Sequence, residues 1–252
     1  MRKPKITVIG AGDVGAATAR RLARRRLGEV VVVDLDHGTP SAPGRDDAGR
    51  AGDYDATAGS DVVVVAAGSA RAPGVSPDEP LDALVRAVSE AVSRAVRKSR
   101  DSIIIMVSEP VDVMCEAARR VSGFPRERVI GVAESLDPAL VRAFTAVDRG
   151  AAREVAPGLG PGRADEALAA SAVEIVDAIV NDRKQIRPCF VYLQGEFGVT
   201  GVFVGVPARL GAAGLEGLAD LPLTADERAQ LQRSAAAAAA RSAGLPADLG
   251  QG

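Results

Sequence analysis

The chain has 252 residues, of which 47% are hydrophobic and 25% are charged, and its formal net charge is −2. This length allows one large or two modest domains, and the balanced charge gives no broad basic surface for nucleic acid. No apolar run approaches the ~20 residues that span a bilayer, and no signal peptide is recognisable at the start. Cys115 and Cys189 lie in apolar settings, which predicts buried free thiols and fits a reducing cytoplasm.

The first half of the chain alternates predicted strands and helices. Apolar runs predict strands at residues 6–9, 30–33, 61–67, 102–107 and 128–133. Apolar residues at helical spacing predict helices at residues 16–27, 81–98, 111–121 and 136–147. Polar, Gly/Pro-bearing stretches predict loops at residues 41–52 and 69–80. Strands this apolar are buried on both faces, so we expect a doubly wound parallel sheet, the α/β Rossmann arrangement.

A different pattern follows a Gly/Pro-rich joint at residues 149–164. The predicted elements there are a helix at 166–181, strands at 189–194 and 202–208, a third strand that includes 216–218, and a helix at 225–242. Thr224 and Glu227 form a capping box that opens the last helix, and we expect a frayed tail at 244–252. The sequence thus predicts a dinucleotide-binding domain at residues 1–134 and a second, smaller α+β domain at residues 135–252.

The strongest motif is a glycine turn between the first predicted strand and helix. It has the form GxGxxG, and a second strand then ends at Asp34. Gly10 allows the tight turn, Gly12 lets the backbone approach a pyrophosphate, and Gly15 lets the helix pack closely on the strand. Free N–H groups at the helix start favour the phosphates, although the charge of Asp13 opposes them mildly.

The acid at the end of the second strand selects the cofactor. Asp34 is placed to accept hydrogen bonds from ribose hydroxyls, and its charge repels a 2′-phosphate, so we predict NAD rather than NADP. Ends of neighbouring strands complete the site, and we predict no metal. The cofactor-binding candidates are Gly10, Gly12, Asp13, Val14, Gly15, Asp34, Ala67, Gly68 and Val107. Five arginines, at positions 20, 21, 24, 25 and 26, are interpreted as the solvated face of the first helix.

Further segments, in order along nearly the whole chain, resemble the lactate/malate dehydrogenase family. They include VVVDLDHGTP, RAPGVS, EPVDVM, VSGFPRERVIG, RPCFVYLQGEFGV and VFVGVPARLG. The resemblance implies a nicotinamide cofactor, a small-molecule substrate bound by the second domain, and a homodimer or tetramer. It also implies a catalytic histidine that exchanges the proton of a 2-hydroxyl, an aspartate that orients it, and arginines that bind or polarise the substrate.

The chain departs from this family pattern at several positions. Its one histidine, His37, lies beside the adenosine end of the predicted cofactor site, and the segment that carries the catalytic histidine is absent. The position of the carboxylate-clamping arginine holds Leu140, and that of the polarising arginine holds Pro77. Glu109 replaces the asparagine that follows the fifth strand. Arg71, which matches the arginine for a distal carboxylate, and Asp137, which matches the orienting aspartate, remain.

Three carboxylates are candidates to replace the lost groups. We expect Glu109, Glu134 and Asp137 to converge near Arg71, where burial would suit a carboxyl group to acid–base work. The alternative is that Glu109 and Glu134 only fill a cavity or pair with Arg71 or Arg142.

The departures favour three hypotheses about function. The first is an NAD(H)-dependent enzyme of altered active site, repurposed for a different redox, dehydration or cyclisation reaction and not an ordinary malate or lactate dehydrogenase. The second is a catalytically dead pseudoenzyme that acts as an NAD sensor or partner subunit. The third is an NAD-dependent dehydrogenase of an alcohol that lacks a 2-carboxylate. The sequence favours the first, because the cofactor motif is retained and the replacements are polar.

Overall fold

One sheet organises the chain. The computed structural model describes residues 2–35, 49–67, 81–133, 136, 140–142, 164–246 and 248–249, and in these ranges nine strands form a continuous sheet in the order β3-β2-β1-β4-β5-β6-β7-β8-β9. The parallel strands are β1 (Lys5–Ile9), β2 (Glu29–Val33), β3 (Arg50–Ala51), β4 (Val62–Val65), β5 (Ile103–Met106) and β6 (Val129–Val132). The antiparallel strands are β7 (Gln185–Gln194), β8 (Thr200–Gly211) and β9 (Gly214–Leu218).

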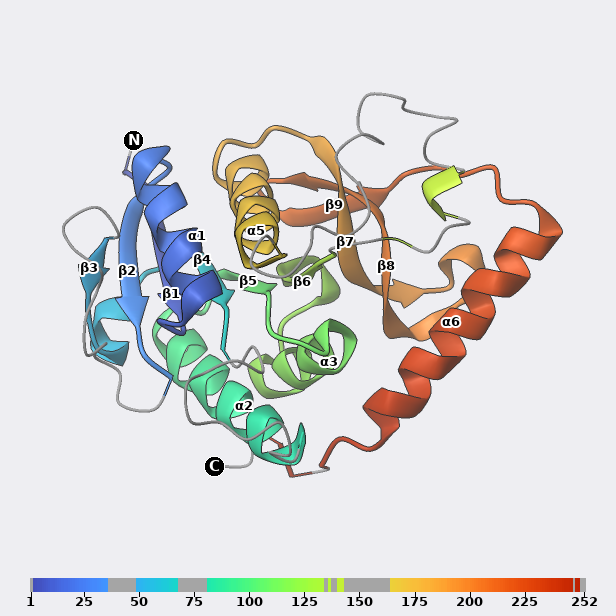
Figure 1. Cartoon of the computed structure of the whole chain (residues 1–252), viewed down its shortest axis with the longest axis horizontal. Helices are drawn as coiled ribbons and strands as arrows, with labels where there is room; N and C mark the ends of the chain where they lie inside the picture. The colour runs from blue at the N-terminus through green and yellow to red at the C-terminus, as the bar shows by residue number, and fades with distance from the viewer. Residues whose placement is uncertain are drawn as a thin grey trace.

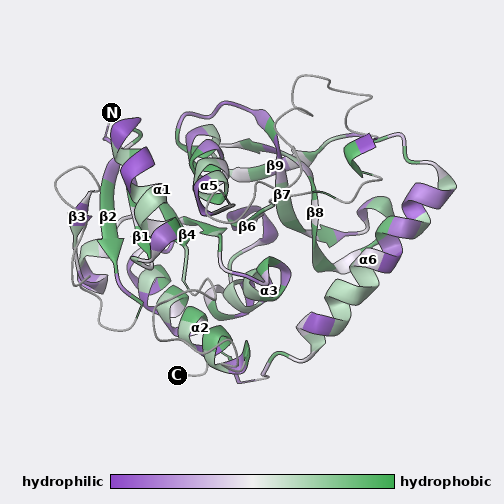
Figure 2. Cartoon of the chain, viewed as in Figure 1, coloured by the Kyte–Doolittle hydropathy of each residue, from purple (hydrophilic) through white to green (hydrophobic). Residues whose placement is uncertain are grey.

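Helices cover both faces of the parallel part (Figure 1). The helices are α1 (Asp13–Arg24), α2 (Leu81–Lys98), α3 (Val111–Ser122), α5 (Ala164–Val180) and α6 (Ala225–Ala243). Alternate residues of the strands enter two buried clusters, so that Ile6 and Val8 pack on the side of α1 and α5 while Ile9 packs on the side of α2 and α3. Figure 2 shows apolar strands flanked by helices that carry both hydrophilic and apolar residues. The predicted fold class is confirmed.

The antiparallel strands extend the same sheet. β6 pairs with β7 through Val132 and Cys189, so the predicted domain boundary after residue 134 lies between two neighbouring strands. That boundary stays a prediction. Strands β7 to β9 with α6 form the smaller α+β part, and α6 crosses it diagonally (Figure 1). In the part of the chain described, no helix is long and apolar enough to cross a membrane.

Several element limits differ from those predicted. α1 begins at Asp13 and not at residue 16, because the last glycine of the turn already lies in the helix. Residues 41–52 are not entirely a loop, since Arg50–Ala51 pairs with β2 as β3. β7 begins four residues early, at Gln185, and runs through Pro188, which lies opposite Pro207. Most of the helix predicted at 136–147 lies outside the described residues.

The two ends of α6 are fixed to the rest of the molecule. The predicted capping box is present, with the Thr224 side chain accepting from the Glu227 N–H and the Glu227 carboxylate accepting from the Thr224 N–H. The tail after α6 is not frayed throughout, because Leu245 is buried against the cluster that contains α2 and Asp248 pairs with Arg86 of that helix.

Candidate functional site

The glycine turn lies against the end of β4. The Gly10 N–H donates to the Val33 carbonyl at 2.9 Å, and Gly10 has φ +101°, a conformation that favours glycine. A Cβ at this position would lie 2.5 Å from the carbonyl oxygen of Ala66. The turn therefore fits between the carboxyl ends of β1, β2 and β4. The strand order reverses between β1 and β4, which is where ligands bind in open α/β sheets.

The other two glycines act as predicted from the motif. A Cβ on Gly15 would overlap the carbonyl oxygen of Gly10, so its absence lets α1 approach the turn. Gly12 is exposed, and nothing lies within 4 Å of a Cβ built on it. Packing among the described residues therefore does not require glycine at position 12. The open space fits the close approach of a pyrophosphate.

No side chain of the described residues caps the start of α1, which leaves its N–H groups available to an anion. Gly12 is its N-cap and provides no side-chain hydrogen bond, and the first helical N–H to bond back is that of Ala16, to the Gly12 carbonyl at 2.8 Å. Asp13 is exposed and Val14 is buried, so Val14 contributes its backbone rather than its side chain. These features fit the pyrophosphate of a dinucleotide.

The remaining cofactor candidates lie at the same edge. Asp34 is half-buried directly after β2, and its Oδ1 accepts the Leu35 N–H at 2.8 Å. Ala67 and Val107 are buried at the ends of β4 and β5. Ser108 connects the ends of these two strands, because the Ala67 N–H donates to the Ser108 Oγ at 2.9 Å. The sequence analysis did not single out this serine. A hydroxyl directly after a buried strand was the available signal. Gly68 lies outside the described residues.

Of the four catalytic candidates, the structure describes one. Glu109 follows β5 at the cofactor edge, before a cis bond to Pro110, and it is exposed. The expectation of burial is therefore wrong for Glu109, because its side chain lies in solvent beyond the sheet. Glu134, Asp137 and Arg71 lie outside the described residues, so their predicted convergence is not tested.

The position matched to the clamping arginine lies in the core. Leu140 is fully buried, in the cluster that contains α5. Two residues later, Arg142 pairs with Glu227 in the first turn of α6, with 3.4 Å between Nε and Oε1. Arg142 therefore pairs with a residue of α6. The alternative in which Arg142 pairs with Glu109 is wrong.

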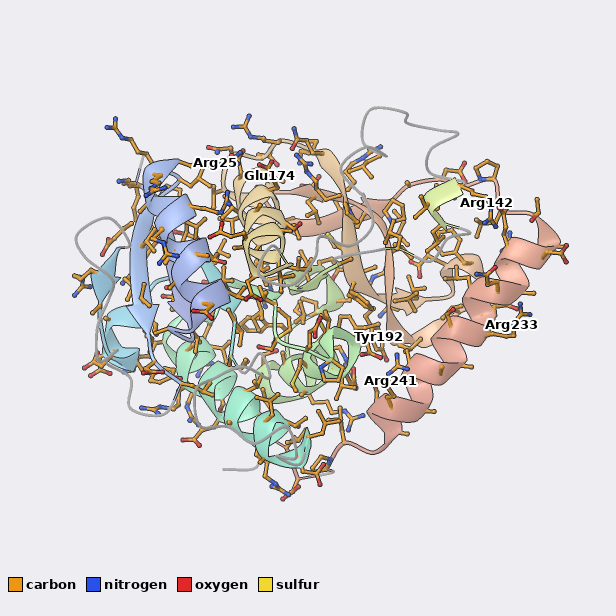
Figure 3. All side chains as sticks on the ribbon, viewed as in Figure 1. Arg25, Arg142, Glu174, Tyr192, Arg233 and Arg241 are labelled. Carbon is orange, nitrogen blue, oxygen red and sulfur yellow. The ribbon has the colours of Figure 1, made fainter. Side chains whose placement is uncertain are left out.

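Two of the five arginines in and directly after α1 do more than face solvent. Arg21 pairs with Glu166 and Arg25 with Glu174, both on α5, and Figure 3 shows Arg25 and Glu174 between the two helices. The interpretation of all five as a solvated face is corrected to this extent. Among the described residues, no three His, Cys, Asp or Glu side chains are grouped to hold a metal.

Comparison with known proteins identifies the family. Residues 4–131 match the lactate/malate dehydrogenase NAD binding domain, and residues 108–241 match the lactate/malate dehydrogenase alpha/beta C-terminal domain. The chain belongs to the lactate/malate dehydrogenase family. The resemblance stated from the motifs is thus confirmed, and so is the cofactor, NAD, which the open glycine turn and Asp34 fit.

Individual relatives cover nearly the whole chain. A malate dehydrogenase of Roseiflexus sp. is 34% identical over 307 aligned positions, with 97% of this chain and 99% of that relative covered. A malate dehydrogenase of Chloroherpeton thalassium is 38% identical, with 92% and 95% covered. The solved structure of the malate dehydrogenase from Salinibacter ruber is 30% identical, with a TM-score of 0.73 and 94% and 95% covered.

These similarities overturn the functional hypotheses drawn from the sequence. A repurposed enzyme, a pseudoenzyme and a dehydrogenase of an alcohol that lacks a 2-carboxylate were the three hypotheses, because the segment with the catalytic histidine is absent and other catalytic residues are replaced. Proteins named malate dehydrogenase match the chain from end to end at this identity, which points to the ordinary function. An alignment of 307 positions is nevertheless longer than the 252 residues present, so some positions of the relative have no counterpart here.

Proposed function

We propose that this protein is an NAD-dependent malate dehydrogenase, which oxidises the 2-hydroxyl of malate to the carbonyl of oxaloacetate and catalyses the reverse reaction. The observation that carries the proposal is the match to malate dehydrogenases over more than nine-tenths of both chains. The geometry at the carboxyl ends of β1, β2, β4 and β5 supports it.

Residues of the described edge are suited to hold the cofactor. The N–H groups at the start of α1 bind the pyrophosphate, and the open space at Gly12 admits it. Asp34 keeps one carboxylate oxygen for the ribose hydroxyls, since the other accepts from Leu35. When bound, NAD accepts the hydride from C2 of malate or, as NADH, returns it to C2 of oxaloacetate.

We propose that a carboxylate exchanges the proton of the malate 2-hydroxyl. The one histidine, His37, follows Asp34 closely in the sequence and therefore belongs to the adenosine side of the cofactor. Glu109 lies at the end of β5, on the edge that receives the cofactor, and its exposed carboxylate is accessible to the 2-hydroxyl. We assign the acid–base role to Glu109, keep Glu134 and Asp137 as alternative acid–base candidates, and assign binding of the distal carboxylate to Arg71.

The decisive measurement is oxidation of NADH by oxaloacetate, followed by absorbance, together with an independent measurement of NADH binding. Wild-type protein is expected to bind NADH and turn over oxaloacetate. Bound NADH without turnover of oxaloacetate or malate would overturn the proposed function.

The acid–base assignment has its own control. Glu109→Gln keeps the shape of the side chain and is expected to lower kcat by about 100-fold or more. Glu90→Gln, an exposed glutamate on α2, is expected to leave kcat unchanged. Equal activity of both variants would remove Glu109 from the acid–base role, and Asp137→Asn and Glu134→Gln would then be compared in the same way.

We further propose that the enzyme is cytoplasmic and forms a homodimer or tetramer. The family resemblance supports the assembly, and the two free, buried cysteines fit a reducing compartment. Light scattering coupled to size-exclusion chromatography tests the assembly, and a mass of one chain at micromolar concentration would contradict it.

A further inference from the structure

An ion pair joins the last turn of α6 to the first turn of α3. The Arg241 guanidinium donates from Nε at 3.0 Å and from Nη2 at 2.7 Å, both to the Oδ2 of Asp112. The two residues are 129 positions apart in the chain. Figure 3 shows Arg241 on the part of α6 that passes α3. This contact holds the end of α6 to the start of α3.

The two partners are buried to different extents. The side chain of Asp112 is 5% exposed, whereas that of Arg241 is 53% exposed. Removing the guanidinium therefore leaves a buried carboxylate without its charged partner, which is costly, while removing the carboxylate leaves an arginine in solvent. The positive end of the α3 dipole compensates only part of that cost. Loss of Arg241 would therefore favour either a shift of the start of α3 toward water or protonation of Asp112.

The start of α3 is continuous with the cofactor edge. α3 begins directly after the turn at residues 107–110, and the Met114 N–H donates to the Pro110 carbonyl at 3.0 Å. On the other side of the turn, the Val107 N–H donates to the Val65 carbonyl, and Ser108 accepts from Ala67. Asp112 is thereby connected through the backbone to Glu109, the residue of the turn with an exposed carboxylate.

We propose that the Arg241–Asp112 ion pair positions the turn at residues 107–110, and Glu109 with it, against the nicotinamide end of the cofactor site. Arg241 and Asp112 are positioning residues, since they act through the turn. The inference rests on the proposed function for its effect on catalysis, but the coupling from α6 to the turn is independent of it. It makes the smaller α+β part a determinant of the geometry at the cofactor edge.

Four variants test this coupling. Arg241→Ala and Asp112→Asn break the pair, and the second keeps the shape of the side chain in case the first fails to fold. Arg241→Lys retains the charge. Arg233→Ala, an exposed arginine on the same helix, is the matched control. The readouts are kcat and KM for oxaloacetate and NADH, the melting temperature, and hydrogen exchange of residues 107–114.

The expected result is a fall in kcat of up to about 100-fold for Arg241→Ala, with KM for NADH little changed, and a smaller fall for Asp112→Asn, which breaks the pair without leaving a buried charge. Arg241→Lys is expected to restore much of kcat, and Arg233→Ala to match wild type. Exchange in residues 107–114 is expected to rise in both pair-breaking variants and in no other. Unchanged exchange there, or an equal change in Arg233→Ala, would overturn the inference. If the wild type turns over neither malate nor oxaloacetate, the proposed function fails, whereas the exchange pattern still decides the coupling.

Discussion

Gly15, in the first turn of α1, lies so close to Gly10 that a Cβ on Gly15 would overlap the Gly10 carbonyl oxygen. The helix therefore rests directly on the turn that follows β1. Gly10 is held in turn by β2 and β4, through the Val33 carbonyl and the close carbonyl of Ala66. The position of the first N–H groups of α1 is thus set by backbone packing alone, before any cofactor binds.

Gly15→Ala is expected to destabilise the protein. In an unobstructed helix this change stabilises by up to about 1 kcal/mol. Here the methyl group would meet a backbone carbonyl that cannot move without disturbing β1, so we expect a net loss of about 1–3 kcal/mol. Urea unfolding of the variant and the wild type measures the difference. An unchanged or higher stability would show that the helix is not held against the turn in this way.

Gly12→Ala, unlike Gly15→Ala, is expected to have a small effect on stability and a large effect on NADH binding. Among the described residues, no atom lies within 4 Å of the added Cβ, so unfolding should change by less than about 1 kcal/mol. The methyl group would occupy the space of the pyrophosphate, and we expect NADH affinity to fall by about tenfold or more. Fluorescence titration with NADH measures this affinity.

The control for this prediction is Gly217→Ala in β9. A Cβ on Gly217 also meets nothing within 4 Å, but the residue lies at the far edge of the sheet from the glycine turn. Its NADH affinity should equal that of the wild type. If Gly12→Ala binds NADH as tightly as Gly217→Ala does, the pyrophosphate does not approach Gly12.

Most of the parallel sheet was predictable because its signals are local. Four consecutive valines at β4 and the apolar run at β5 indicate strands buried on both faces, and Gly123 ends α3 in a left-handed conformation, as its position predicts. β3 was not predictable, because two residues carry no periodicity. The early start of β7 was missed since Pro188 is unusual within a strand, although the structure places it opposite Pro207.

The parts of the candidate site that lie within one local motif were predictable from the sequence. The glycine turn and Asp34 belong to one βαβ unit, so spacing alone brings them together. The Arg241–Asp112 pair depends on how α6 packs, and no local pattern reports that. Burial of Glu109 was expected from its predicted convergence with Glu134 and Asp137, whereas the end of β5 leaves this side chain in solvent.

The two thiols are expected to be unreactive in the folded protein. Cys115 and Cys189 are fully buried. Burial raises the pKa of both thiols, and the nearby Asp112 carboxylate raises that of Cys115 further. Because the thiolate is the reactive form, a disulfide reagent at pH 8 should not modify native protein within minutes. Two thiols per chain should react after unfolding in guanidinium chloride. Rapid reaction of the native protein would contradict the burial.

The stability of α3 is expected to depend on pH through Glu116. Burial disfavours its charge, but hydrogen bonds from Arg119 and Arg120 outweigh that effect and hold the pKa of Glu116 below its ordinary 4.5. A lowered folded-state pKa stabilises the protein above the unfolded value, and the contribution is lost as the pH falls through the folded one. Glu116→Gln removes this contribution to stability. At pH 7 the variant should be less stable by about 1–3 kcal/mol.

The pH dependence separates this effect from a loss of packing. The stability difference between wild type and Glu116→Gln should shrink as the pH is lowered from 5 through the folded-state pKa of the carboxyl group. A packing defect would persist at every pH instead. Glu90→Gln, on the exposed face of α2, serves as the reference and should show little difference at either end. Urea unfolding at several pH values between 3 and 7 measures all three proteins, and a constant difference for Glu116→Gln would exclude the ion pairs as its cause.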